Sequence, residues 1–264
     1  MISQCNNSQQ EALLNYIGED YPKCLYLYLD VIKYGCLSDT TRTWIQTRDG
    51  VITSVVLSYH TALHVFSRNS AFDVAEICEL VKEVKPTMVN AMAETIRKIE
   101  PELSKLGFRS EFGHIGEWMG SADRIEDDEV SIAKEKDIPE VARLLYEDEN
   151  IGASYIFEDL LKQMQDRINE GYVRSYVLHK NNEVAAHVGT GAEIKNVCTI
   201  AYSITSPKYR GHGLAGRLYN YSCSRLKSEG KRIFSVYYPE SARVLHHKMG
   251  FVDICKCGKL YLNI

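Results

Sequence analysis

The stretch that decides the fold is Ser203-Ile-Thr-Ser-Pro-Lys-Tyr-Arg-Gly-His-Gly-Leu-Ala-Gly-Arg217. It continues a segment rich in Val, Ile, Thr and Tyr, which predicts a strand over 196–205, and it runs into a helix predicted over 214–229. The turn between them is basic and rich in glycine. Such a turn presents backbone N–H groups at the start of a helix, where glycine admits a ligand and the helix dipole favours negative charge. The stretch therefore predicts a pyrophosphate site.

A tight turn that needs glycine for steric reasons alone is the alternative interpretation. The spacing favours the ligand site, because Arg210-Gly-His-Gly-Leu-Ala215 fits R-x-x-G-x-A. The stretch contains neither the Gly-Lys-Ser/Thr of a P-loop nor a G-x-G-x-x-G fingerprint with a downstream acid. It resembles the coenzyme A loop of the GNAT acyltransferase superfamily. Glu240-Ser-Ala-Arg-Val-Leu-His-His-Lys-Met-Gly-Phe251 resembles the last helix of that superfamily, and the resemblance covers residues 130–264.

The resemblance implies a coenzyme site in which acetyl-CoA is a co-substrate and no metal takes part. In the family two strands splay apart to admit the pantetheine arm, and a backbone N–H polarises the thioester carbonyl. By position this N–H falls at Ile204 or Thr205, which otherwise simply fill the sheet. The expected coenzyme-binding residues are Ile204, Thr205, Arg210, Gly211, His212, Gly213, Leu214, Ala215 and Gly216.

The resemblance also implies direct attack of an amine on acetyl-CoA in a ternary complex, so none of the cysteines must be a nucleophile. The family often has a Tyr acid four residues before the Gly of Gly-Phe, and His246 stands there. An imidazole can donate a proton near neutral pH, although a packed or surface His is the alternative. Glu193 is the only carboxylate between Glu183 and Glu229, which makes it the candidate base; a solvated loop Glu, with water as the base, is the alternative.

The acidic stretch 120–129 predicts a linker between domains at 1–122 and 130–264. In the second domain we expect strands at 130–132, 172–178, 184–189 and 232–238. We expect helices that begin at Asp137, include 160–168 and cover 239–249. A hairpin of residues 251–255 and 259–262 is expected to end the chain's fold.

The first half echoes this plan, with strands at 43–47 and 51–57 around Asp49-Gly50 and helices at 71–84 and 87–99. No glycine occurs between Gly50 and Gly107, so a pyrophosphate loop of this type cannot form there. We expect an α+β fold of tandem GNAT-like domains, each a mixed, mostly antiparallel sheet flanked by helices, with a coenzyme-free first domain. The plan is similar to that of the glycine N-acyltransferase-like group.

Composition excludes several classes of protein. The 264 residues are 45% hydrophobic and 25% charged, as in soluble globular proteins, and no apolar run is long enough for a membrane span. Eight scattered cysteines without C-x-x-C or paired metal spacing, and no visible signal peptide, favour reduced thiols in the cytoplasm. Residues 171–264 carry 14 basic and five acidic residues, which suits an anionic ligand. The pI near 6.1 argues against a general nucleic-acid binder.

These observations predict an N-acetyltransferase that transfers an acetyl group from acetyl-CoA to a primary amine of a small molecule or peptide. The alternative is a non-catalytic coenzyme A sensor or interaction module, which the unusual His246 keeps open. We expect a monomer or homodimer that binds neither nucleic acid nor membrane.

Overall fold

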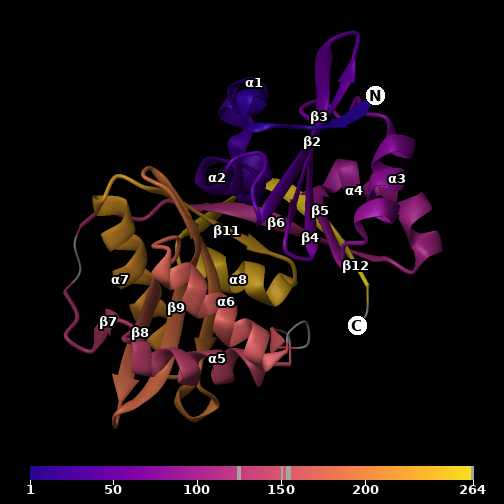
Figure 1. Ribbon diagram of the computed structural model, residues 1–264. Helices are drawn as coiled ribbons and strands as arrows, with labels where there is room; N and C mark the ends of the chain where they lie inside the picture. Colours follow the sequence, from indigo (N-terminus) through magenta and orange to yellow (C-terminus); the bar gives the residue numbers. More distant parts are fainter. Residues whose placement is uncertain (124–125, 150, 153–155, 263–264) are drawn as a thin grey trace. The chain divides into compact units, whose positions relative to one another are not determined.

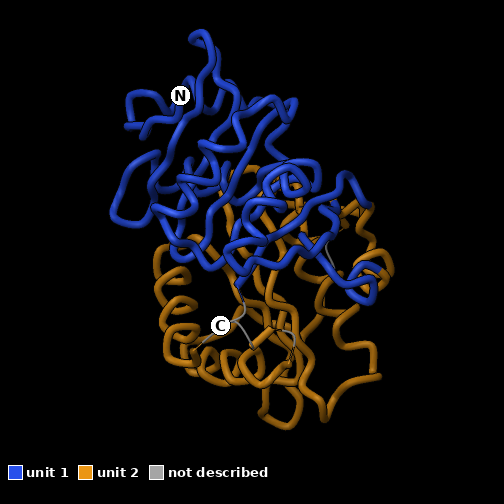
Figure 2. The backbone as a smooth tube through the Cα atoms, turned by 90° about the vertical axis from the view of Figure 1, so that its right-hand side faces the viewer, with its two compact units in different colours: residues 1–116, 236–243, 253–264 blue, residues 117–235, 244–252 orange. Residues whose placement is uncertain are grey.

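The computed structural model describes all residues except 124–125, 150, 153–155 and 263–264. The chain forms two compact units, drawn in two colours in Figure 2. The first unit comprises Met1–Gly116, Val236–Arg243 and Asp253–Ile264, and the second comprises Glu117–Ser235 and Val244–Val252. Among the described residues, no helix combines the length and apolar character that crossing a membrane requires.

One order of elements, β-α-α-β-β-β-α-β-α-β, occurs twice along the chain when short 3-10 turns are set aside (Figure 1). The first series is β1 Ile2–Gln4, α1 Gln10–Ile17, α2 Leu25–Tyr34, β2 Thr41–Arg48, β3 Val51–Tyr59, β4 Ala62–Phe66, α3 Val74–Val84, β5 Met88–Met92, α4 Ala93–Leu103 and β6 Arg109–Trp118. The second series is β7 Val130–Ile132, α5 Ile138–Tyr146, α6 Phe157–Asn169, β8 Ser175–Lys180, β9 Glu183–Glu193, β10 Val197–Thr205, α7 Leu214–Ser228, β11 Arg232–Tyr237, α8 Glu240–Lys248 and β12 Phe251–Tyr261.

Each part of the sheet is mixed, mostly antiparallel and flanked by helices, which confirms the predicted fold class. The strand order is β1-β2-β3-β4-β5-β12-β6 in one part and β11-β10-β9-β8-β7 in the other. Parallel pairing joins β4 to β5 and β10 to β11, whereas β2–β3, β3–β4, β8–β9 and β9–β10 are antiparallel.

The C-terminal segment differs from the predicted hairpin. Residues 251–261 form one strand, and Gly258 lies within it, paired with Ala91 of β5. A Cβ on Gly258 would stand 3.0 Å from Ile96 Cγ1 and 3.1 Å from Phe112 Cδ1, so this glycine allows close packing rather than a turn. Backbone hydrogen bonding to β5 places most of β12 in the first unit. The compact units therefore differ from a division at 1–122 and 130–264.

The helix predicted over 87–99 is also partly wrong, because Met88–Met92 is a strand and the helix begins at Ala93. Met and Ala favour helices, but Val89 and Ala91 alternate with less buried neighbours and pair in parallel with Leu63 and Val65 of β4. Tertiary pairing here overrides local propensity.

Two apolar clusters pack the sheet of the second unit. The first combines side chains of α7 with β8–β11, and the second combines α5 and α6 with residues of β8, β9 and β10. Leu218, Cys223 and Leu226 are wholly buried in the first, and Val141 and Leu145 in the second. Full burial of such an aliphatic side chain contributes about 1.5–3 kcal/mol, so both helix layers hold β10 firmly. Cys198 and Cys223 are wholly buried and act as small hydrophobic residues.

Candidate coenzyme and catalytic site

The loop before α7 exposes its backbone. Gly211 and Gly213 have φ of +81° and +73°, values that side-chain-bearing residues rarely adopt. A Cβ on either glycine would meet no atom within 4 Å. No side chain caps α7, whose N-cap is Gly213, and the first turn of a helix leaves its N–H groups without helical partners. The loop therefore offers N–H donors beside open space, which suits a pyrophosphate.

The other predicted loop residues hold this arrangement in place. Arg210 Nε donates to the Thr205 carbonyl oxygen at 3.1 Å, which ties the loop to the end of β10, while its side chain is 55% exposed. His212 Nδ1 lies 2.9 Å from the Arg210 carbonyl oxygen. Leu214 anchors the helix start in the core. Gly216 instead faces Met249, whose Sδ would be 3.6 Å from an added Cβ. Ala215 is half-buried in the first turn.

The pairing of β10 with β11 stops halfway along β10. The parallel register joins Val197–Ile200 to Arg232–Ser235, yet β10 continues to Thr205 and β11 to Tyr237. On its other edge β10 stays paired with β9, through an irregularity between Ala201 and Ile204. Ile204 and Thr205 therefore lie on the part of β10 that has left β11, as the resemblance implies.

His246 lies at the point where the two strands part. Its Nε2 is 3.0 Å from Ser235 Oγ and 3.3 Å from the Tyr219 hydroxyl, and that hydroxyl is 2.5 Å from Ser203 Oγ. Ser235 is the last residue of β11 paired with β10, and Ser203 lies on the unpaired part of β10. A continuous hydrogen-bonded chain therefore joins the two strands at their parting. Burial raises the pKa of Tyr219, so its phenol keeps its proton.

Sequence reasoning missed Tyr219, Ser203 and Ser235. Tyr219 lies four residues after Ala215 on the same helix, so its place on α7 was readable. Its meeting with His246, 27 residues later, depends on the packing of α7 and α8 and left no signal in the sequence.

Glu193 is the last residue of β9 and lies opposite the start of β10. It pairs with Cys198, before the strands part, and its carboxylate accepts from Arg174 Nη2 at 2.7 Å and lies 3.6 Å from Lys231 Nζ. Thr190 Oγ1 donates to it at 2.8 Å. The structure does not bring Glu193 to His246. This ion-paired setting is that of a structural carboxylate, and the predicted role as a base finds no support in the geometry.

The first unit lacks both features of the coenzyme site within its described residues. The ladder of β4 with β5 joins Ala62–Val65 to Met88–Ala91 and so covers nearly all of β4. At the start of α3 the Asp73 carboxylate accepts from Ala75 N at 2.9 Å and Glu76 N at 3.2 Å. A carboxylate thus occupies the place where an anionic ligand would bind.

Comparisons with known proteins agree with this geometry. Residues 138–251 match the model of the acetyltransferase (GNAT) family. Among solved structures, a Drosophila protein has a TM-score of 0.69 at 13% identity and covers 99% of this chain and 98% of its own. A GCN5-related N-acetyltransferase from Sphaerobacter thermophilus has a TM-score of 0.63 at 11% identity, with 98% and 94% covered.

A tandem GNAT protein from the clavulanic acid biosynthesis pathway, solved without AcCoA, has a TM-score of 0.60 at 10% identity and covers 98% of both chains. No curated protein sequence matches the chain. At these identities the structural likeness establishes the fold alone.

Proposed function

Because residues 138–251 match the model of the acetyltransferase (GNAT) family, we propose that the protein is an N-acetyltransferase that transfers an acetyl group from acetyl-CoA to a primary amine. The observation that carries the proposal is the parting of β10 and β11 next to the uncapped, glycine-lined start of α7. The gap between the strands suits a pantetheine arm, and the start of α7 suits a pyrophosphate. The described residues of the first unit show neither feature, so we assign the coenzyme to the second unit.

In the proposed reaction the amine nitrogen attacks the thioester carbonyl, a C–N bond forms and the C–S bond breaks. The nitrogen loses a proton and the sulfur gains one. The chain Ser203–Tyr219–His246 supplies the second proton, because a hydroxyl on the open part of β10 is linked through the phenol to the imidazole. Proton donation of this kind contributes about 10²–10⁴-fold to the rate.

A second function, a coenzyme A sensor without catalysis, is favoured by one observation. His246 stands where the family often has a Tyr, and Ser235 and Tyr219 already satisfy its ring nitrogen. Such a protein would bind acetyl-CoA through the same loop and leave the thioester intact.

Two measurements on the full chain test the proposal. Calorimetry should show one acetyl-CoA bound per chain, in agreement with a first unit that lacks the site. Release of free thiol should then depend on an added amine from a panel of small amines and N-terminal peptides. Binding without thiol release for any amine would favour the sensor. Absence of binding, or two coenzyme molecules per chain, would contradict the assignment of the site.

A further inference from the structure

The strand β10 carries a bulge at Tyr202. Between Ala201 and Ile204 the strand has two residues, whereas their partners on β9, Gly189 and His187, enclose only one. One extra residue on one strand of an antiparallel pair is a β-bulge. Tyr202 has φ of +56°, a value that residues with a side chain rarely adopt. The bulge therefore holds a strained backbone conformation within the part of β10 that has left β11.

Before the bulge, alternate residues of this segment point to β11. The Asn196 carbonyl accepts from Arg232 N at 2.9 Å, and the Ile200 carbonyl accepts from Ser235 Oγ at 3.2 Å. Successive residues of a strand direct their backbone N–H and C=O groups to opposite edges. Without the bulge, the backbone groups of Ile204 would therefore point to the side that β11 has left.

After the bulge, the alternation is reversed. Ser206 N donates to the Ala185 carbonyl of β9 at 3.0 Å, so the backbone groups of the preceding Thr205 point away from β9. In agreement, the Thr205 carbonyl accepts from Arg210 Nε at 3.1 Å. The Thr205 N–H, and not the Ile204 N–H, therefore points to the side that β11 has left.

The side chains show the same reversal. Ile200 packs in the cluster with α7, whereas Ile204 packs in the cluster with α5 and α6. Residues four apart in a regular strand share a face, so only the bulge separates these two. Ser203 is delivered to the α7 face, where it meets the Tyr219 hydroxyl. Both the N–H that faces the open side and the hydroxyl bonded to Tyr219 thus depend on the bulge.

His187 fastens the bulge. The ladder with β9 passes over Tyr202, and His187 Nδ1 donates to the Tyr202 carbonyl at 2.7 Å. The imidazole is 1% exposed and lies against the bare backbone of Gly189, where an added Cβ would stand 3.1 Å from Cε1. A buried ring in this confined place keeps its donor aimed at the bulge.

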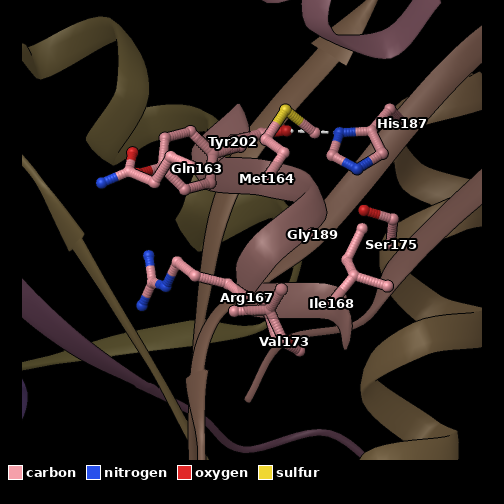
Figure 3. Close-up of a pocket in the computed structure, with 10 residues that line it drawn as sticks. Gln163, Met164, Arg167, Ile168, Val173, Ser175, His187, Gly189 and Tyr202 are labelled. Atoms are coloured by element: carbon pink, nitrogen blue, oxygen red, sulfur yellow. Dashed lines mark hydrogen bonds between the residues drawn. The ribbon is translucent and has the colours of Figure 1, made fainter. Parts of the chain in front are cut away.

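The rest of the imidazole is closed to substrates. It borders a cavity of about 20 Å³ between α6 and strands β8 to β10, which has room for about one water molecule (Figure 3). Burial lowers the pKa of His187 to about 4, so at neutral pH the ring carries one hydrogen, on Nδ1. The titratable groups that line the same cavity are Arg167 and Tyr202. Any role of His187 therefore acts through its bond to the Tyr202 carbonyl.

We propose that His187 is a positioning residue for acetyl transfer, which holds the bulge at Tyr202 and so directs the Thr205 N–H to the thioester carbonyl. The inference rests on the function proposed above. As the amine attacks, the carbonyl oxygen gains negative charge, and the Thr205 N–H stabilises that charge. His187 itself exchanges no proton. Removing one such donor typically lowers kcat by about 10²–10³-fold.

Two variants of equal shape isolate the Nδ1 hydrogen bond. In His187→Asn the side-chain amide can still donate to the Tyr202 carbonyl, whereas the isosteric His187→Leu has no donor. The matched control is His179→Leu, because His179 lies on neighbouring β8, bonds Asp137 at 3.2 Å and does not line the cavity. Calorimetry measures acetyl-CoA affinity, and thiol release measures kcat with the amine that the wild type acetylates fastest.

His187→Leu should lose at least about 100-fold in kcat while its acetyl-CoA affinity stays within about fivefold. His187→Asn should keep kcat within about tenfold of the wild type, and His179→Leu should match the wild type. Infrared spectra with [¹³C]carbonyl-labelled acetyl-CoA add a direct readout. A hydrogen bond weakens the C=O bond, so the thioester stretch should lie lower in the wild-type complex than in free acetyl-CoA and return toward the free value in His187→Leu.

A measurement on the wild type needs no variant to fold. In ¹⁵N–¹H spectra the Thr205 amide proton should move downfield on acetyl-CoA binding, and the Ile204 amide proton should not. A downfield shift of Ile204 instead would overturn the assignment of the donor. A kcat of His187→Leu within threefold of the wild type, or equal losses in the Leu and Asn variants, would overturn the role of His187 and leave the proposed function intact. Acetyl-CoA binding without transfer to any amine by the wild type would overturn both.

Discussion

Replacing Gly213 by Ala separates backbone strain from coenzyme binding. Gly213 is the N-cap of α7 with φ of +73°, and an added Cβ meets no protein atom within 4 Å. The variant therefore introduces no clash within the folded protein. Its stability should fall only by the cost of placing an L-residue in the left-handed region, about 1–2 kcal/mol.

The effect on binding should be larger. The new methyl group projects into the open space beside the α7 donors, where the pyrophosphate is expected. Losing one charge-assisted hydrogen bond costs about 1.5–3 kcal/mol, which corresponds to about 10- to 150-fold in the dissociation constant. Losing two such hydrogen bonds would multiply the two fold-changes in the dissociation constant. We therefore expect acetyl-CoA affinity to fall by at least about tenfold.

Gly230→Ala is the matched control. Gly230 follows the other end of α7 with φ of +82°, and its added Cβ also meets nothing within 4 Å. Denaturant unfolding should give similar stability losses for the two variants, and calorimetry should show weaker acetyl-CoA binding only for Gly213→Ala. Equal affinities in two folded variants would refute the assignment of the loop.

Two further predictions concern the histidines of the second unit. His246→Phe keeps a buried ring but removes the proton, so kcat in a thiol-release assay should fall at least about tenfold while acetyl-CoA affinity stays within a few-fold. His247→Phe, on the exposed face of the helix, should change kcat little. Equal and small effects of the two variants on kcat would contradict proton donation by His246. Because burial depresses the pKa of His187 to about 4 against 6.5 unfolded, its contribution to stability is present above pH 6.5 and lost toward pH 4. Urea titrations of the wild type and His187→Asn should therefore show that the difference between their unfolding free energies decreases by about 2 kcal/mol from pH 7 to pH 5. The neighbouring groups Arg167 and Tyr202 are the same in both proteins, so their titration does not affect this difference. A difference that stays constant with pH would contradict the depressed pKa of His187.

Local chemistry made much of the fold predictable. The Asp49-Gly50 turn has positive φ at both residues and joins β2 to β3, and Asn181 and Asn182 do the same between β8 and β9. These turns depend on which residues tolerate left-handed backbone, a property of the residues themselves. The predicted Leu214–Glu229 helix and its glycine loop are confirmed for the same reason.

Local patterns failed where distant segments compete. Gly258 has the residue type of a turn, but its place in β12 depends on strand β5 and on the side chains of Ile96 and Phe112. The Met88–Met92 segment has helix-forming residues, yet pairing with β4 makes it a strand. No window of sequence around either segment contains its partner.

The candidate site divides in the same way. The sequence alone determined the glycine loop that we propose as the coenzyme site, because a helix start with glycines at fixed spacing is built from consecutive residues. It also marked His246, through its distance from Gly250. Only the tertiary structure decided that His246 meets Tyr219 and Ser235 and that Arg174 neutralises Glu193. It alone also left His187 Nε2 buried without a hydrogen-bond partner among the described residues. Proton donors and acceptors act over about 3 Å, and only packing brings side chains from separate strands and helices within that distance.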